Sequence, residues 1–221
     1  MPKYVPYLSE EQIERDAAVL LAEFEQSRGI VVKRHVPIED IVEKHLKLGL
    51  EFDDMHRRLN IPRSGLHDPN ILGAMFFDER RIVIDESLDP AETPSMEADY
   101  RFTLAHEGGH WRLHRRLFAR KVRFALFNKP APPSLACHSV EWQADCYAKC
   151  LLMPRKLVMA AWEEMFPDRK PRVVQPRNHL SVWVVIVFPL ADQFLVSPGL
   201  MFIRLFMLGL LRSEVMHQRG A

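Results

Sequence analysis

The run His106-Glu107-Gly108-Gly109-His110 constrains this chain more than any other feature of its sequence. It has the pattern H-E-x-x-H and lies within a predicted helix over residues 100–117. Side chains four residues apart lie on the same face of a helix, about 6 Å apart along its axis. Two imidazoles in this arrangement can bind one metal ion, and Glu107 is placed to face a water that the metal activates. We therefore expect a fold built around a helix that carries a metal site.

A catalytic zinc ion needs three protein ligands and one open position, so the chain must supply a third ligand. The metzincin pattern needs a glycine and a histidine where this chain has Leu113 and Arg116, so that pattern is excluded. His114 follows His110 by four residues. However, positions 106, 110 and 114 extend along about 12 Å of one helix, which is too far for a single ion. We expect His114 to cap or pack the end of the helix.

The remaining candidate is Glu141, which opens a second predicted helix over residues 140–152. Ser139 is its expected N-cap, and Pro154 lies just beyond its end. Asp145 follows Glu141 by four residues and therefore shares its face of the helix. One carboxylate can then bind zinc while the other accepts the N–H of a ligating histidine and fixes its tautomer. H-E-x-x-H followed by E-x-x-x-D is the gluzincin arrangement. The alternative is that both carboxylates merely solvate a helix face.

Two segments of the chain resemble the ImmA/IrrE family of metallopeptidases. They are Arg101-Phe102-Thr103-Leu104-Ala105-His106-Glu107 with His110-Trp111 and Leu113-His114, and Glu141-Trp142-Gln143-Ala144-Asp145 with Tyr147-Ala148 and Leu151-Leu152-Met153-Pro154. The hairpin before the first segment and residues 196–211 are also similar to that family. The resemblance implies a zinc protease of bacterial or phage type. Well-known relatives cut a helix-turn-helix repressor and so switch on stress-response or mobile-element genes. Gly108 departs from the family, whose members usually carry a bulky apolar residue there.

The composition is that of an ordinary globular protein. The chain has 221 residues, 48% of them hydrophobic and 27% charged, with a net charge of +1 that points neither to nucleic acid nor to a membrane. Three cysteines without framework spacing suit a reducing compartment, and Cys146 and Cys150 are expected to be small buried residues rather than ligands. The first ten residues contain no apolar signal-peptide core, so we expect a cytoplasmic protein.

We predict an α+β fold, in which a zincin-like metalloprotease domain over residues 1–170 contains the active-site helix and a small β-sheet. A helical, helix-turn-helix-like C-terminal segment would follow over residues 171–221. Near the N-terminus, Ser9 and Gln12 form a capping box for a helix that Gly29 ends, and another helix is expected over residues 37–48.

Residues 71–77 and 81–84 predict a β-hairpin around Asp78-Glu79-Arg80. In zincins, an edge strand beside the metal helix commonly receives the substrate backbone as an added strand. This hairpin is the natural candidate for such an edge, and a purely structural hairpin is the equal alternative.

Seven basic residues and no acidic residue lie between His110 and Glu141: Arg112, Arg115, Arg116, Arg120, Lys121, Arg123 and Lys129. They could attract an acidic substrate segment or DNA, or they could form a solvated face.

The apolar stretch 180–211 is interrupted by Pro189 and Pro198, so no membrane span is expected. Its spacing resembles a helix-turn-helix, but Arg204 is the only side chain of residues 199–207 suited to base edges. We expect a packing or protein-contact element here, with a homodimer surface as one option and no direct nucleic-acid binding.

These patterns together predict a zinc-dependent endopeptidase with a protein substrate. His106, His110 and Glu141 would hold Zn²⁺, and the ion would keep one position for water. Glu107 would take a proton from that water as general base and pass it to the leaving amine, while Asp145 would orient a ligating histidine.

The sequence leaves three points open. Tyr100, His138 and His179 are candidates for stabilising the oxyanion, and manganese or iron can occupy similar ligands. The main alternative function is a non-catalytic regulator that binds a repressor through a metalloprotease fold, although a binding protein has no need of a base such as Glu107. DNA binding by the C-terminal segment ranks third.

Overall fold

The computed structural model describes residues 5–61, 71–118, 123–127 and 140–214. The chain forms two compact units, of which the first comprises Met1–Val31 and Pro37–Leu151 and the second comprises Val32–Val36 and Leu152–Ala221. Both units mix helices with short strands, and the structure confirms the predicted α+β class. The expected boundary at residue 170 between a catalytic domain and a C-terminal segment remains a prediction.

Helix α1 (Glu10–Arg28) forms as its capping residues predict. The Ser9 hydroxyl accepts the N–H of Gln12, whose side chain in turn accepts the N–H of Ser9. Gly29 ends the helix with a φ of 63°, a left-handed conformation that glycine adopts without steric cost. The buried face consists of the apolar residues at helical spacing, Ile13, Ala17, Leu20, Leu21 and Phe24.

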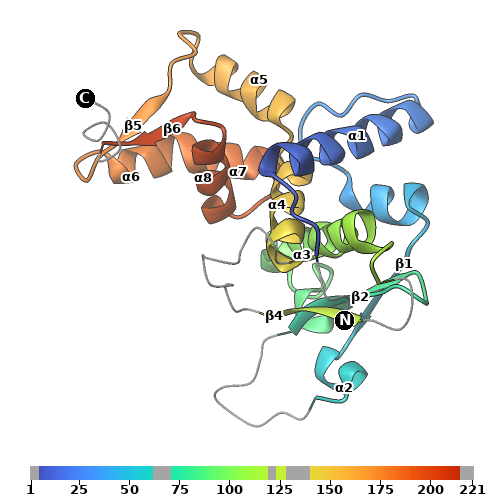
Figure 1. Cartoon of the computed structure of the whole chain (residues 1–221). Helices are drawn as coiled ribbons and strands as arrows, with labels where there is room; N and C mark the ends of the chain where they lie inside the picture. Colours follow the sequence, from blue (N-terminus) through green and yellow to red (C-terminus); the bar gives the residue numbers. More distant parts are fainter. Residues whose placement is uncertain (1–4, 62–70, 119–122, 128–139, 215–221) are drawn as a thin grey trace. The chain divides into compact units, whose positions relative to one another are not determined.

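A four-stranded sheet, in the order β1-β3-β2-β4, forms the second layer of this unit (Figure 1). The predicted hairpin is present as β2 (Ile71–Phe76) and β3 (Arg81–Asp85), which pair antiparallel. The two edges are β1 (Gly49–Asp53), parallel to β3, and β4 (Arg123–Phe127), antiparallel to β2. Both hairpin strands therefore lie inside the sheet, and the prediction of the hairpin as its edge is wrong.

Helices contact both faces of this sheet (Figure 1). On one side lies α3 (Glu97–Gly109), which continues into the π-helical turn η4 (His110–His114). The approach is close, because a Cβ added to Gly73 of β2 would lie 2.7 Å from the Cγ2 of Thr103. On the other side, Met55 of the short helix α2 (Met55–Leu59) packs against the strand residues Ile71, Ala74, Phe76 and Val83. The metal helix is thus anchored on the sheet along its length.

Two elements differ from the prediction. The helix expected over residues 37–48 is shorter and contains the π-helical segment η1 (Asp40–His45), after which the chain enters β1. The loop expected over residues 85–96 contains two 3₁₀ turns, η2 (Glu86–Leu88) and η3 (Pro94–Met96), that lead into α3. Helix α4 (Val140–Leu152) has the predicted bounds.

The second unit is helical, with a two-stranded parallel sheet of β5 (Arg172–Val174) and β6 (Leu211–Ser213). Its helices are α5 (Arg155–Met165), α6 (His179–Val182), the π-helical η6 (Trp183–Val187), α7 (Phe188–Phe194) and α8 (Pro198–Met207). Arg204 is buried in this unit, and its Nε donates to the carbonyl of Met153 at 3.0 Å. A side chain held in this way cannot read base edges, which supports a packing role for α8.

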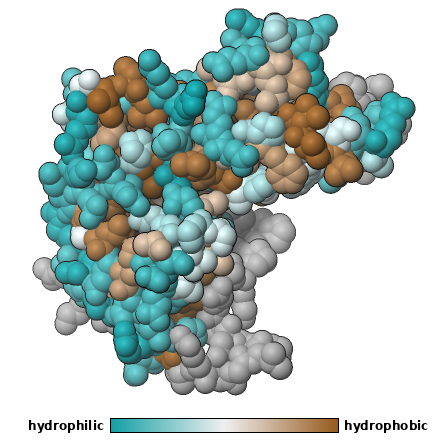
Figure 2. Space-filling view, turned by 180° about the vertical axis from the view of Figure 1, so that it is seen from behind, coloured by the Kyte–Doolittle hydropathy of each residue, from teal (hydrophilic) through white to brown (hydrophobic). Residues whose placement is uncertain are grey.

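The second unit also exposes apolar side chains, and brown atoms gather on it in Figure 2. The exposed apolar side chains of this unit include Val173, Leu180, Val184, Val185, Phe188, Leu195 and Ile203. Within the described residues, no single helix has both the length and the apolar character to cross a membrane. The pair His179–Phe194 and Pro198–Met207 meets the length and composition limits only when joined across a bend of 103°.

Candidate metal centre

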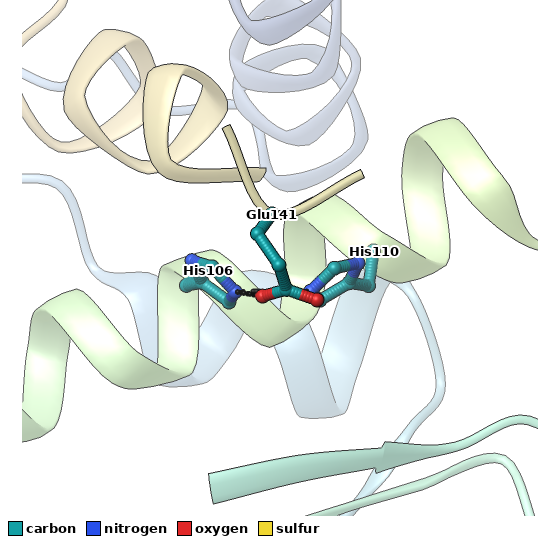
Figure 3. Close-up of side chains that lie close together, drawn as sticks. All are labelled: His106, His110 and Glu141. Atoms are coloured by element: carbon teal, nitrogen blue, oxygen red, sulfur yellow. Dashed lines mark hydrogen bonds and ion pairs between the residues drawn. The ribbon is translucent and has the colours of Figure 1, made fainter. Parts of the chain in front are cut away.

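Two buried imidazoles face each other at the junction of α3 and η4. His106 and His110 have no exposed surface, and their Nε2 atoms lie 2.9 Å apart (Figure 3). The spacing of four residues brings them to one face of the helix, as the sequence predicts. A cation could bind both Nε2 atoms at once when neither of them carries a hydrogen.

Glu141 reaches the same point from the first turn of α4 (Figure 3). Its Oε2 lies 3.2 Å from Nε2 of His106 and 3.5 Å from Nε2 of His110. The candidate ligand atoms of the three residues all lie within 4.8 Å of one another. Two imidazole nitrogens and one carboxylate oxygen are a donor set found in catalytic zinc sites, so the residues present fit a zinc ion.

The electrostatics of these groups reflect burial and their mutual contacts. Burial alone would raise the pKa of Glu141, but its hydrogen bonds with His106 and His110 outweigh that effect and lower the pKa. For His106, burial lowers the pKa, whereas the carboxylates of Asp145 and Glu141 raise it to about 10. Burial lowers the pKa of His110. The pocket is therefore negatively polarised and suits a cation.

Asp145 lies one turn after Glu141 on α4 and contacts the outer nitrogen of His106. Its Oδ1 is 2.9 Å from the Nδ1 of that imidazole. A carboxylate in this position holds the hydrogen on Nδ1 and leaves Nε2 free to bind a metal. The geometry is the one that the i, i+4 spacing of the two acidic residues predicts.

The outer nitrogen of His110 contacts another histidine. Its Nδ1 lies 3.1 Å from Nδ1 of His114, whose Nε2 lies 3.0 Å from the side-chain oxygen of Gln143. His114 also packs against Phe118 at the end of the helix, as predicted. Sequence reasoning missed its contact with His110, although the spacing of four residues between them was a signal for it. It also missed Gln143, two residues after Glu141.

Glu107 is fully buried beside these groups. Neither of its carboxylate oxygens makes a hydrogen bond of normal geometry with the described residues. Burial raises the pKa of Glu107 to about 8, with a further increase from the charge of Glu141 and opposing effects of His106 and of the backbone N–H of Met75. A buried carboxylate with so little hydrogen bonding is costly, because its desolvation is poorly compensated.

Of the three oxyanion candidates, Tyr100 and His179 have other hydrogen-bond partners. The Tyr100 hydroxyl donates to Glu39 at 2.8 Å, and its pKa is raised by burial and by that carboxylate. His179 belongs to the second unit, where it accepts the indole N–H of Trp183 at 3.1 Å. His138 lies outside the described residues.

Two members of the basic cluster, Arg112 and Arg115, have local partners. Arg112 contacts Asp16 at 2.8 Å and Glu23 at 3.1 Å, which ties η4 to α1. The guanidinium of Arg115 lies 5.7 Å from the ring centroid of Trp111. Arg120, Lys121 and Lys129 lie outside the described residues, and Arg123 is described only as a backbone position in β4. These contacts favour a structural role for Arg112 over recruitment of an acidic substrate.

The prediction that two of the cysteines are small buried residues is confirmed. Cys146 and Cys150 are buried on α4, and they form no disulfide within the described residues. A hydrogen bond between them and burial both raise the pKa of Cys146, so this thiol stays protonated.

Comparison with known proteins adds the family. No curated protein matches the chain. The sequence profile of a peptidase family, described as the IrrE N-terminal-like domain, matches residues 58–206. This range includes α3, α4 and every residue of the candidate metal centre. Because the match covers more than half of the chain, the protein belongs to the IrrE N-terminal-like peptidase family.

Proposed function

We propose that this protein is a zinc-dependent endopeptidase. The observation that carries the proposal is the convergence of His106, His110 and Glu141, whose ligand atoms lie within 4.8 Å of one another, beside a buried Glu107. Membership of a peptidase family gives the reaction class, peptide-bond hydrolysis. Zinc is the proposed metal because two imidazoles and one carboxylate match its preferred catalytic donor set.

Each residue has a distinct role in the proposed reaction. A bound Zn²⁺ supplies Lewis acidity toward the scissile carbonyl and lowers the pKa of a water molecule. With a metal bound, Glu107 would act as the general base toward water and would then pass the proton to the leaving amine. Asp145 keeps the hydrogen of His106 on Nδ1.

The proposed substrate is a helix-turn-helix transcriptional repressor in a stress-response or mobile-element circuit. The support for this finer assignment is the resemblance of α3 and α4 to the ImmA/IrrE metallopeptidases. A cytoplasmic location is part of the same proposal, because three cysteines without framework spacing suit a reducing compartment.

The proposal predicts that metal binding and catalysis separate in two variants. Wild type should contain about one zinc per chain and Glu141→Ala should lose it, whereas Glu107→Gln should keep it because that substitution removes only the base. Cleavage of a peptide library, read by mass spectrometry, should fall at least about a hundredfold in Glu107→Gln.

The outcomes discriminate between the candidate functions. Retained cleavage in Glu107→Gln would exclude Glu107 as the base. A wild-type protein that holds zinc, cuts nothing and binds a repressor tightly would favour the non-catalytic regulator.

A further inference from the structure

A continuous line of hydrogen-bonding groups runs from His110 away from the metal centre. Nδ1 of His110 contacts Nδ1 of His114 at 3.1 Å, and Nε2 of His114 contacts Oε1 of Gln143 at 3.0 Å. The amide nitrogen of Gln143 then donates to the carbonyl of Pro6 at 2.8 Å. His110, His114 and Gln143 are all at most 1% exposed, so solvent does not compete for the contacts among these three side chains.

The carbonyl of Pro6 determines which group donates and which accepts at each contact of the line. A backbone carbonyl can only accept, so the group of Gln143 that faces Pro6 must be its NH₂. The amide oxygen of Gln143 therefore faces His114, and it can only accept from Nε2. His114 must then carry a hydrogen on Nε2.

The charge of His114 then determines which of the two rings carries the hydrogen between His114 and His110. The described hydrogen-bond partners of His114 are an imidazole and an amide, and neither is a carboxylate that would compensate a buried cation. A neutral His114 with its hydrogen on Nε2 has a bare Nδ1, which accepts. The hydrogen between the two rings must therefore belong to Nδ1 of His110, which leaves Nε2 of His110 with a lone pair facing Glu141 and His106.

We propose that His114 and Gln143 are positioning residues that hold His110 in its metal-binding tautomer. This inference deepens the proposed function and rests on it, because it assigns His110 as a ligand. It also separates the two imidazoles of the site. His106 is oriented by a carboxylate whose side chain is 41% exposed, whereas His110 is oriented by the buried side chains of His114 and Gln143. Ligating histidines more commonly donate to carboxylates, carbonyls or water.

The first test is the tautomer of His110 in the zinc-free wild-type protein. Long-range ¹⁵N–¹H correlation spectra of the imidazoles distinguish a protonated from a bare ring nitrogen, and the signals of His110 are assigned by their loss in His110→Gln. We expect a hydrogen on Nδ1 and none on Nε2. A hydrogen on Nε2 of His110 would overturn the proposal, whatever the protein's activity.

The second test interrupts the line of hydrogen-bonding groups at His114 and at Gln143. His114→Phe keeps a ring but no acceptor, and Gln143→Leu removes the amide two contacts away from His110. In both variants we expect His110 to populate both tautomers and zinc affinity, measured by chelator competition, to fall about 10- to 100-fold. His114→Asn, which offers an amide oxygen near the place of Nδ1, should restore part of the affinity.

Two controls separate positioning from general damage. The hydrogen on Nδ1 of His106 should stay in place in every variant, because that nitrogen faces Asp145. His45→Phe, a similar substitution in η1 outside the site, should change neither tautomers nor zinc affinity. Unchanged His110 tautomer and unchanged zinc affinity in folded His114→Phe and Gln143→Leu would refute the proposal. Failure of wild type to bind zinc would refute the proposed function, while the tautomer of the zinc-free protein would still decide the role of His114.

Discussion

The carboxylate of Glu107 lies in surroundings that favour its protonated form. Burial raises its pKa to about 8 from an ordinary value of 4.5, and the charge of Glu141 acts in the same direction. The folded metal-free protein therefore keeps a proton on Glu107 in a pH range where the unfolded chain has lost it. A bound cation would reverse this preference, because it favours the charged carboxylate.

This shift predicts a pH-dependent stability for the metal-free protein. Between pH 4.5 and 8 the folded state binds more protons than the unfolded state, so the free energy of unfolding falls as the pH rises. Relative to Glu107→Gln, which cannot ionise, wild type should lose on the order of 5 kcal/mol across this window, at about 1.4 kcal/mol per pKa unit. Urea unfolding of both proteins at several pH values measures the difference. Free energies of unfolding that change with pH in parallel in the two proteins would contradict the raised pKa of Glu107.

The sequence indicated which candidate side chains lie close together where local spacing carries the information. His106 and His110, and likewise Glu141 and Asp145, share a helix face through a separation of four residues, so their grouping on each helix follows from helix geometry. The partnership of Gln143 with Pro6 joins positions 137 residues apart. No local pattern encodes such a contact, and the orientation of His110 was therefore not foreseen.

The two adjacent glycines of α3 face different surroundings. A Cβ added to Gly109 would lie 3.2 Å from Cβ and Cδ1 of Tyr147, so this glycine allows α4 to approach the metal helix. A Cβ added to Gly108 would lie 3.8 Å from Val42, which is ordinary van der Waals contact. Only Gly109 is required by packing, and Gly108 merely weakens the helix.

Alanine substitutions at these positions should consequently have opposite effects. Gly108→Ala should stabilise the protein by about 1 kcal/mol, the difference in helix propensity between the two residues. Gly109→Ala should destabilise it, because Tyr147 is fully buried and has little room to move. Chemical denaturation of the pair tests the contrast, and equal changes in both variants would refute it.

Helices whose ends are marked by local sequence signals were predicted accurately. The positions of strands, which depend on pairing with strands far away in the sequence, were not. The capping box and Gly29 fix both ends of α1 within the segment itself. Strand β1 pairs with β3, which follows it only after α2 and β2, and the edge position of β4 depends on its pairing with β2. The order of strands is therefore a tertiary property, which explains why the hairpin was mistaken for an edge. The π-helical turn at His110 has no sequence signal that we can identify.

All three candidate ligands belong to the first compact unit, so a bound metal would stabilise that part of the protein directly. Zinc in about a thousandfold excess over its dissociation constant would contribute about 4 kcal/mol through linkage. The second unit, from Leu152 onward, supplies no residue to the metal centre among the described residues.

Removal of metal should therefore act unevenly along the chain. We expect chelation to increase amide hydrogen exchange most in α3 and α4, with smaller changes in α7 and α8. Hydrogen exchange with and without a chelator measures the pattern by mass spectrometry. Glu141→Ala provides the control, since its exchange should not respond to the chelator, and a uniform response of wild type would contradict a metal site confined to the first unit.

The contact between Gln143 and Pro6 has a practical consequence for work with this protein. The residues before α1 look dispensable by their position, yet the carbonyl of Pro6 is the final acceptor for a buried amide that lies two contacts away from His110. A fusion tag or a truncation that displaces Pro6 would remove this acceptor, and by our proposal it would weaken metal retention although every candidate ligand remained intact. Purification handles are better attached elsewhere, and low metal content in an N-terminally altered preparation would say little about the natural enzyme.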